Sequence, residues 1–125
     1  MLAEVPNPRQ VPNDYRRRWF NDETFDLIVW FADDNDIVGF ELCYRLLGFE
    51  RALTWMEDRG YRHSDVDTGD NRPASYGMTP ILTPDGAFDA PRIADLFKHA
   101  AAKLDPEIRQ FVLERLDKYP DKSNM

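Results

Sequence analysis

An apolar alternation that stays in phase over residues 24–56 constrains the fold of this chain more than any other feature. Residues 25–31 are rich in aromatic and β-branched side chains, as strands are, and residues 37–44 repeat the pattern. Between them, Asp33–Asp36 is a polar run of the kind that forms hairpin turns. The predicted pairs are Phe31 with Val38, Val29 with Phe40, Leu27 with Leu42 and Phe25 with Tyr44. A slip of one residue would mix the two faces, so the pattern itself selects this register.

A third strand continues the alternation. Its turn is predicted over Leu47–Glu50, which pairs Tyr44 with Leu53 and Leu42 with Trp55. These residues fall on the face that carries the first apolar set. Because three strands agree on one apolar face, we predict that this face is the core side of the sheet.

A fourth strand is predicted at residues 61–66, after a turn that contains Gly60. Glycine suits the left-handed backbone position that such a turn needs. A hairpin closed over Asp58–Tyr61 sets the register of this strand. The predicted pairs are Met56 with His63, Thr54 with Asp65 and Ala52 with Asp67.

The second face of the predicted sheet, which we call the mixed face, combines apolar and charged side chains. Trp30 falls opposite Gly39, so that its ring can lie across bare backbone. A half-apolar face is suited to a pocket floor. The alternative, which is more common, is a surface partly covered by the ends of the chain or by a second subunit. The residues of the mixed face are Asp26, Ile28, Trp30, Ala32, Ile37, Gly39, Glu41, Cys43, Arg45, Ala52, Thr54 and Met56.

Two amphipathic helices are predicted to close the chain. Apolar residues recur at helical spacing over residues 93–104, after Asp89 as a start signal. The second helix begins with Asp105 as N-cap and Pro106 at its first position, and Pro120 ends it. Strands followed by helices favour an α+β fold. We therefore predict an antiparallel meander sheet of about four to six strands with two C-terminal helices packed on one face.

The predicted organisation is one domain between two short ends. Residues 1–14 form a Pro-rich extended arm, residues 15–120 form the α+β domain, and residues 121–125 form a tail. A short edge strand is predicted near the start of the domain, at residues 15–20. The polar loop at residues 68–77 is long enough to be functional, although it can equally be a plain connection before a short strand at residues 78–83.

The net charge of this chain limits the classes of partner that it can bind. With 16 basic and 23 acidic residues, its net charge is −7, which argues against nucleic acid as a partner. Three successive arginines at positions 16–18 invite an anion-binding interpretation, but pairing with nearby carboxylates is favoured in so acidic a chain. Neither a signal-peptide pattern nor an apolar run of membrane-spanning length is present, so a cytoplasmic protein without a membrane partner is expected.

The most concrete candidate for chemistry is a metal site. His63, Asp65 and Asp67 alternate along the fourth strand and so share one side of it, which in the predicted register is the mixed face. Glu41 lies on the same face two strands away, about 10 Å at the backbone. Imidazole and carboxylates suit a divalent metal. The alternative, which we favour, is a polar strand end running into a turn.

Other catalytic arrangements are weak. The single cysteine, Cys43, has no partner for an internal disulfide and is expected to be a small buried hydrophobic residue of a strand rather than a nucleophile paired with His63 or His99. Asp26 and Glu41 lie on adjacent strands but not directly opposite each other. For both carboxylates, solvation or an ion pair, for example with Arg45, is favoured over acid–base catalysis. No cofactor is indicated.

Several runs of the sequence resemble those of a group of small uncharacterised bacterial proteins. The likeness covers roughly residues 15–90. It implies a bacterial cytosolic setting, and it implies no activity, because none is attached to that group. The runs are Trp19-Phe20, Phe25-Asp26-Leu27-Ile28-Val29-Trp30, Gly39-Phe40-Glu41-Leu42-Cys43-Tyr44, Glu50-Arg51-Ala52-Leu53-Thr54-Trp55 and Thr79-Pro80-Ile81-Leu82.

These observations favour a non-enzymatic binding or protein-interaction module. Its contact surface would be the mixed face, with Trp30, Glu41, Met56, Asp26 and Arg45 as the candidate binding residues. The partner would be another protein or a second copy of the chain in a homodimer. The alternatives are a metal-dependent hydrolase that uses the His63 cluster and a small-ligand-binding protein that uses the same face.

Overall fold

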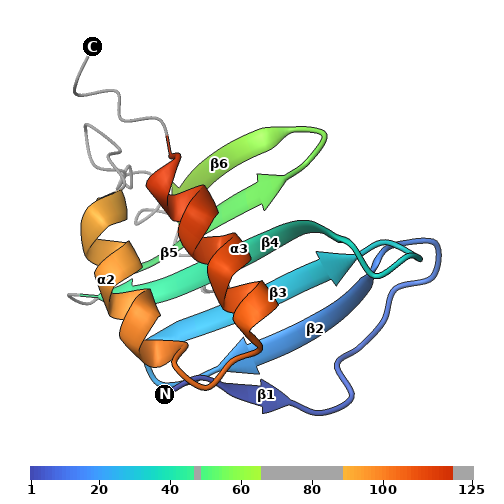
Figure 1. The fold of residues 1–125 in the computed structure, drawn as a ribbon, viewed down its shortest axis with the longest axis horizontal. Helices are drawn as coiled ribbons and strands as arrows, with labels where there is room; N and C mark the ends of the chain where they lie inside the picture. The colour runs from blue at the N-terminus through green and yellow to red at the C-terminus, as the bar shows by residue number, and fades with distance from the viewer. Residues whose placement is uncertain (47–48, 66–88, 120–125) are drawn as a thin grey trace, which may run out of the picture.

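The computed structural model describes residues 1–46, 49–65 and 89–119, which form one antiparallel sheet and two helices (Figure 1). The sheet has six strands in the order β1-β2-β3-β4-β5-β6, so each strand pairs with its neighbour in sequence. This is the predicted α+β meander. The elements are β1 Ala3–Val5, β2 Arg16–Asn21, β3 Phe25–Phe31, β4 Ile37–Leu46, β5 Phe49–Met56, β6 Gly60–Asp65, α2 Ala90–Ala100 and α3 Pro106–Asp117.

Both helices cover the same face of the sheet (Figure 1). Phe97 of α2 is fully buried and packs edge to face on Phe25 of β3, with 5.9 Å between ring centroids. Phe111 of α3 packs in the same way on Phe40 of β4 and on Trp55 of β5. The core therefore lies on the side that the alternation predicted, and neither helix is long and apolar enough to cross a membrane.

The predicted helix starts are confirmed. The Asp89 side chain accepts a hydrogen bond from the backbone N–H of Arg92 at 3.2 Å and caps α2. Asp105 stands at the N-cap of α3, but its carboxylate makes no cap hydrogen bond. It accepts one from Arg18 of β2 instead.

The hairpin of β3 and β4 has the predicted register except at its tip. The pairs Phe25–Tyr44, Leu27–Leu42 and Val29–Phe40 are present, and Phe31 pairs with Ile37 rather than with Val38. The register shifts between Trp30 and Phe31, so Val38 is an extra residue of the kind that forms a β-bulge. Because of this bulge Ile37 leaves the mixed face and packs against the core.

The predicted register of β4 and β5 is wrong by two residues. Leu42 pairs with Leu53, and Tyr44 pairs with Arg51, because the pairing continues to Leu46 and Phe49. Only residues 47–48 then connect the two strands, and two-residue connections are the commonest in hairpins. A shift of two keeps every side chain on its predicted face.

The predicted register of β5 and β6 is wrong by three residues, and an odd shift exchanges the faces. Met56 pairs with Gly60 and Leu53 pairs with His63. The turn is tighter than predicted, since the Arg59 N–H donates to the Met56 carbonyl at 3.1 Å and Gly60 takes the left-handed φ of 78°. His63 is consequently on the core face.

The arginine-rich strand β2 was predicted to lie at the edge of the sheet. This prediction is wrong, because β1 pairs along part of β2. Leu2, next to β1, is buried and its N–H donates to the carbonyl of Ala100 at 2.8 Å. Farther along the arm, the side chain of Gln10 bonds the backbone N–H and carbonyl of Arg17, each at 3.0 Å. The predicted loop 68–77, strand 78–83 and tail 121–125 lie outside the described residues.

Two of the three arginines pair with carboxylates, as favoured from sequence, and Arg16 bonds an amide instead. Arg17 pairs with Asp14 at 3.2 Å, and Arg16 donates to the side chain of Asn35. Arg18 holds both oxygens of Glu4, at 2.7 and 2.9 Å, and also reaches Asp105 at 3.1 Å. Arg18 therefore ties β1 and β2 to the start of α3.

This tie should make the stability of the fold sensitive to acid. The hydrogen bonds from Arg18 hold the pKa of Glu4 below its ordinary value of 4.5. A carboxylate whose pKa is lowered by folding contributes stability above its unfolded pKa, and that contribution is lost as pH falls through the lowered value. We expect Arg18→Gln to flatten the loss of stability below about pH 4.5, measured as urea midpoints across an acid pH series. The matched control is Arg9→Gln in the exposed arm, and superimposable pH profiles for the two variants would contradict this assignment.

Candidate functional site

The mixed face gathers the five candidate binding residues on the side of the sheet away from the helices. Asp26 and Trp30 come from β3, Glu41 and Arg45 from β4, and Met56 from β5. Each alternates with a core residue, and the pairs Trp30–Gly39 and Gly39–Met56 join three strands in one row across the face. Pairing adds Arg17 and Trp19 of β2 and Arg62 of β6 to the same face.

A polar ladder crosses one end of the mixed face. The indole N–H of Trp19 donates to Asp26 at 3.1 Å, and Asp26 also pairs with Arg45. The Nε atom of Arg45 lies 3.4 Å from the carboxylate of Glu50. The ion pair of Asp26 with Arg45 confirms the interpretation favoured from sequence. It leaves Asp26 engaged in structure rather than free for acid–base chemistry.

Cys43 and Glu41 are neighbours on β4 and touch across the mixed face. The Cys43 thiol donates to a carboxylate oxygen of Glu41 at 3.5 Å. Burial and the nearby carboxylate of Glu41 raise the pKa of the Cys43 thiol to about 12. The thiol is therefore protonated at neutral pH, and a protonated thiol is a poor nucleophile.

The apolar part of the mixed face lies around Gly39. A side chain at position 39 would collide with the sulfur of Met56, so it is Met56 that lies over the bare backbone. Trp30 pairs with Gly39 as predicted, and its ring lies 5.8 Å from the guanidinium of Arg17. Trp30, Ile28 and Met56 are all half-buried.

The candidate metal ligands His63 and Glu41 are not brought together. His63 lies on the core face, where its Nε2 atom lies 2.8 Å from the hydroxyl of Tyr44 and the two rings stack at 6.1 Å. Glu41 lies on the opposite face, and Asp67 is outside the described residues. Across the described part of the chain, no three His, Cys, Asp or Glu side chains are grouped to hold a metal. A Cys43–His63 pair is likewise ruled out by the two faces, and His99 is exposed on α2 as expected.

The pair of Tyr44 and His63 is the polar feature that sequence reasoning missed. The signal was present, because a tyrosine at a core-facing strand position carries a hydroxyl that needs a partner. The pair was missed because the predicted register of β6 is wrong by three residues. That register places His63 on the mixed face, away from Tyr44 on the core face.

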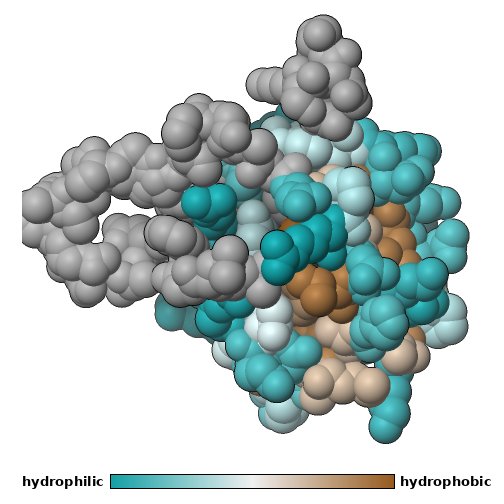
Figure 2. Space-filling model, turned by 90° about the vertical axis from the view of Figure 1, so that its left-hand side faces the viewer, coloured by the Kyte–Doolittle hydropathy of each residue, from teal (hydrophilic) through white to brown (hydrophobic). Residues whose placement is uncertain are grey.

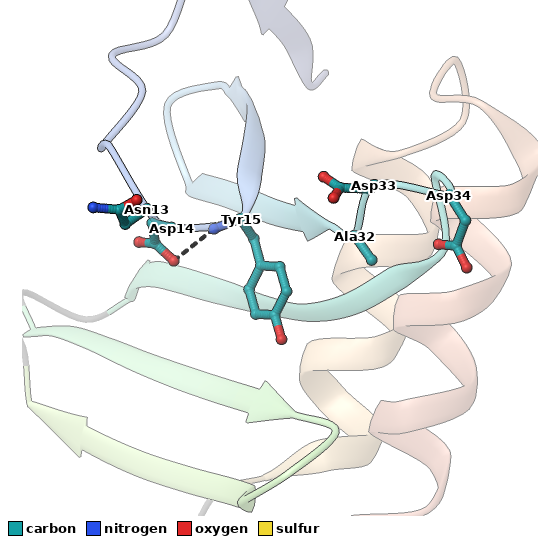
Figure 3. A pocket seen from close by; sticks show the side chains of 6 residues that line it. All are labelled: Asn13, Asp14, Tyr15, Ala32, Asp33 and Asp34. Atoms are coloured by element: carbon teal, nitrogen blue, oxygen red, sulfur yellow. Dashed lines mark hydrogen bonds between the residues drawn. The ribbon is translucent and has the colours of Figure 1, made fainter.

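A second surface feature is an open hollow of about 800 Å³ between the N-terminal arm and the turn after β3 (Figure 3). Three of its side chains are carboxylates, Asp14, Asp33 and Asp34. Asp14 is already engaged, since it accepts a hydrogen bond from the N–H of Tyr15 at 2.7 Å and pairs with Arg17. The hollow is acidic and exposed, and its other polar side chains are the amide of Asn13 and the phenol of Tyr15.

No protein-family model matches the chain, and neither a curated protein nor a solved structure matches it. The resemblance to small bacterial proteins therefore stays a prediction.

Proposed function

We propose that this chain is a non-enzymatic interaction module whose contact surface is the mixed face. The observation that carries the proposal is the division of the sheet. Both helices pack on the core face, while the mixed face presents half-buried Ile28, Trp30 and Met56 among charged residues. Aromatic and methionine side chains bordered by charges are typical of protein contact surfaces.

The chemistry of the same face supports binding over catalysis. Burial of the Cys43 thiol keeps it protonated, and Asp26 is held by Trp19 and Arg45. Neither group is poised to transfer a proton or to attack a substrate. Figure 2 shows the molecule from the side, with hydrophobic and hydrophilic residues next to each other on the described surface; this view does not look onto the mixed face.

Photo-crosslinking tests this proposal directly. The single cysteine is replaced in Cys43→Ser, and a benzophenone maleimide is attached at Thr54→Cys, in the middle of the mixed face. We expect illumination to give a discrete adduct, identified by mass spectrometry, with the purified protein or in cell extract. The matched control carries the same reagent at Gln110→Cys, an exposed position of α3.

An adduct from position 54 that is absent from position 110 supports the mixed face as the contact surface. Equal labelling from both positions, or no adduct from position 54 in either preparation, would refute the proposal. The reagent reports whatever lies over the face. The result therefore does not depend on knowing the partner beforehand.

A further inference from the structure

We propose that the partner of the mixed face is a second copy of this chain, held by reciprocal ion pairs between Glu41 and Arg62. This inference rests on the proposed function and names its partner. It begins from the charges of the mixed face, because a surface that is covered on binding must have its ionised groups compensated.

Most of these charges are compensated within the chain. Arg45 pairs with both Asp26 and Glu50, and Arg17 pairs with Asp14. These contacts use two of the arginines on the face and both acids of its polar ladder. Arg45 serves two carboxylates, so the polar ladder keeps one negative charge more than it has positive ones.

One anion and one cation remain among the described residues of the mixed face. Glu41 is half-buried on β4, and its one hydrogen bond comes from the weak donor Cys43. Arg62 is exposed on β6, and its side chain makes no ion pair or hydrogen bond with a described residue. A carboxylate covered by an apolar partner would lose its hydration without compensation. Whatever covers Glu41 must therefore bring a cation.

The positions of these two residues make the face self-complementary. Glu41 pairs with Thr54 and Thr54 pairs with Arg62, so the three lie in one row across β4, β5 and β6. Glu41 and Arg62 are thus two strand spacings apart, about 10 Å, with side chains standing off the sheet rather than toward each other. A two-fold axis along β5 in the plane of contact exchanges their positions. The strands that face each other are then β4, β5 and β6, so Met56 lies inside the contact and Trp30 of β3 borders it. Each Glu41 then faces Arg62 of the second copy.

The residues on this axis suit contact with themselves. Ala52, Thr54 and Met56 alternate along β5 on the mixed face. They are small or flexible, and a methionine adapts its shape to a second methionine. Glu50 also faces this axis from β5, and in each copy its carboxylate lies 3.4 Å from Arg45 of the same chain.

Charge reversal tests the geometry. We expect the wild type to have twice the mass of one chain by light scattering, and each of Glu41→Arg and Arg62→Glu to weaken the dimer by about 100-fold or more. In a dimer of either variant with itself, like charges would face each other in both pairs. An equimolar mixture of the two variants opposes unlike charges in both pairs, so we expect the mixture to form a heterodimer. The matched control is Glu114→Arg, the same change at an exposed position of α3.

Recovery on mixing separates a lost contact from a failure to fold, because misfolded chains would not recover. A wild type that stays monomeric at high concentration overturns the proposal, and so do single variants that dimerise like the wild type or a mixture that stays monomeric. If the chain is monomeric and the crosslinker at position 54 captures a different protein, the second-copy inference fails. In that case the proposed function stands.

Discussion

Replacement of Phe97 with alanine is expected to lower the free energy of unfolding by about 3–5 kcal/mol. Phe97 is fully buried at the centre of α2, and its ring meets Phe25 of β3 at an interplanar angle of 81°. The substitution removes the apolar area of the ring and leaves a cavity between helix and sheet. Small domains are stable by only about 5–15 kcal/mol, so this one contact is a large share of the total.

Urea unfolding followed by circular dichroism measures the effect. Lys98→Ala is the matched control, because Lys98 is exposed on the next position of the same helix, and it should change stability by less than about 0.5 kcal/mol. Phe97→Leu keeps most of the volume and should fall between the two. If Phe97→Ala were as stable as Lys98→Ala, α2 would not be packed on the sheet in solution.

The meander was predictable because its apolar alternation distinguishes the two faces of each strand. That same period of two leaves some questions open. It cannot separate registers that differ by two residues, and this is why β5 slid along β4 without changing faces. The bulge at Val38 was hidden for a related reason. Val38 and Ile37 are both apolar, and either could have paired with Phe31.

For the candidate site residues too, the prediction was correct where the apolar alternation is strong and wrong where it is weak. The predicted face was correct for Trp30, Glu41 and Met56, since all three lie on strands with strong alternation. It was wrong for His63, because the weak alternation of β6 left its register to the turn. The length of that turn depends on a backbone hydrogen bond and on the left-handed φ of Gly60, which residue types alone do not determine.

Gly39→Val is expected to destabilise the protein by about 3 kcal/mol. This is the opposite of what β-propensity alone predicts, because valine is more favourable than glycine in a strand. A Cβ atom at position 39 would lie only 2.7 Å from the backbone carbonyl oxygen of Trp55, and it would also collide with the sulfur of Met56. The sulfur is on a flexible side chain. The carbonyl belongs to β5 and cannot move without disturbing the pairing of β4 with β5.

A second substitution separates the two collisions. Met56→Ala in the Gly39→Val background removes the sulfur but leaves the carbonyl, so we expect it to recover less than half of the lost stability. Thr54→Val is the matched control. It places valine on the same face of the neighbouring strand, and it should change the urea midpoint little. If the double variant recovered all of the lost stability, the Trp55 carbonyl would be able to move away from the new side chain. Met56 alone would then be the reason that position 39 requires glycine. A Gly39→Val protein as stable as the wild type would place the two strands farther apart in solution than this sheet allows.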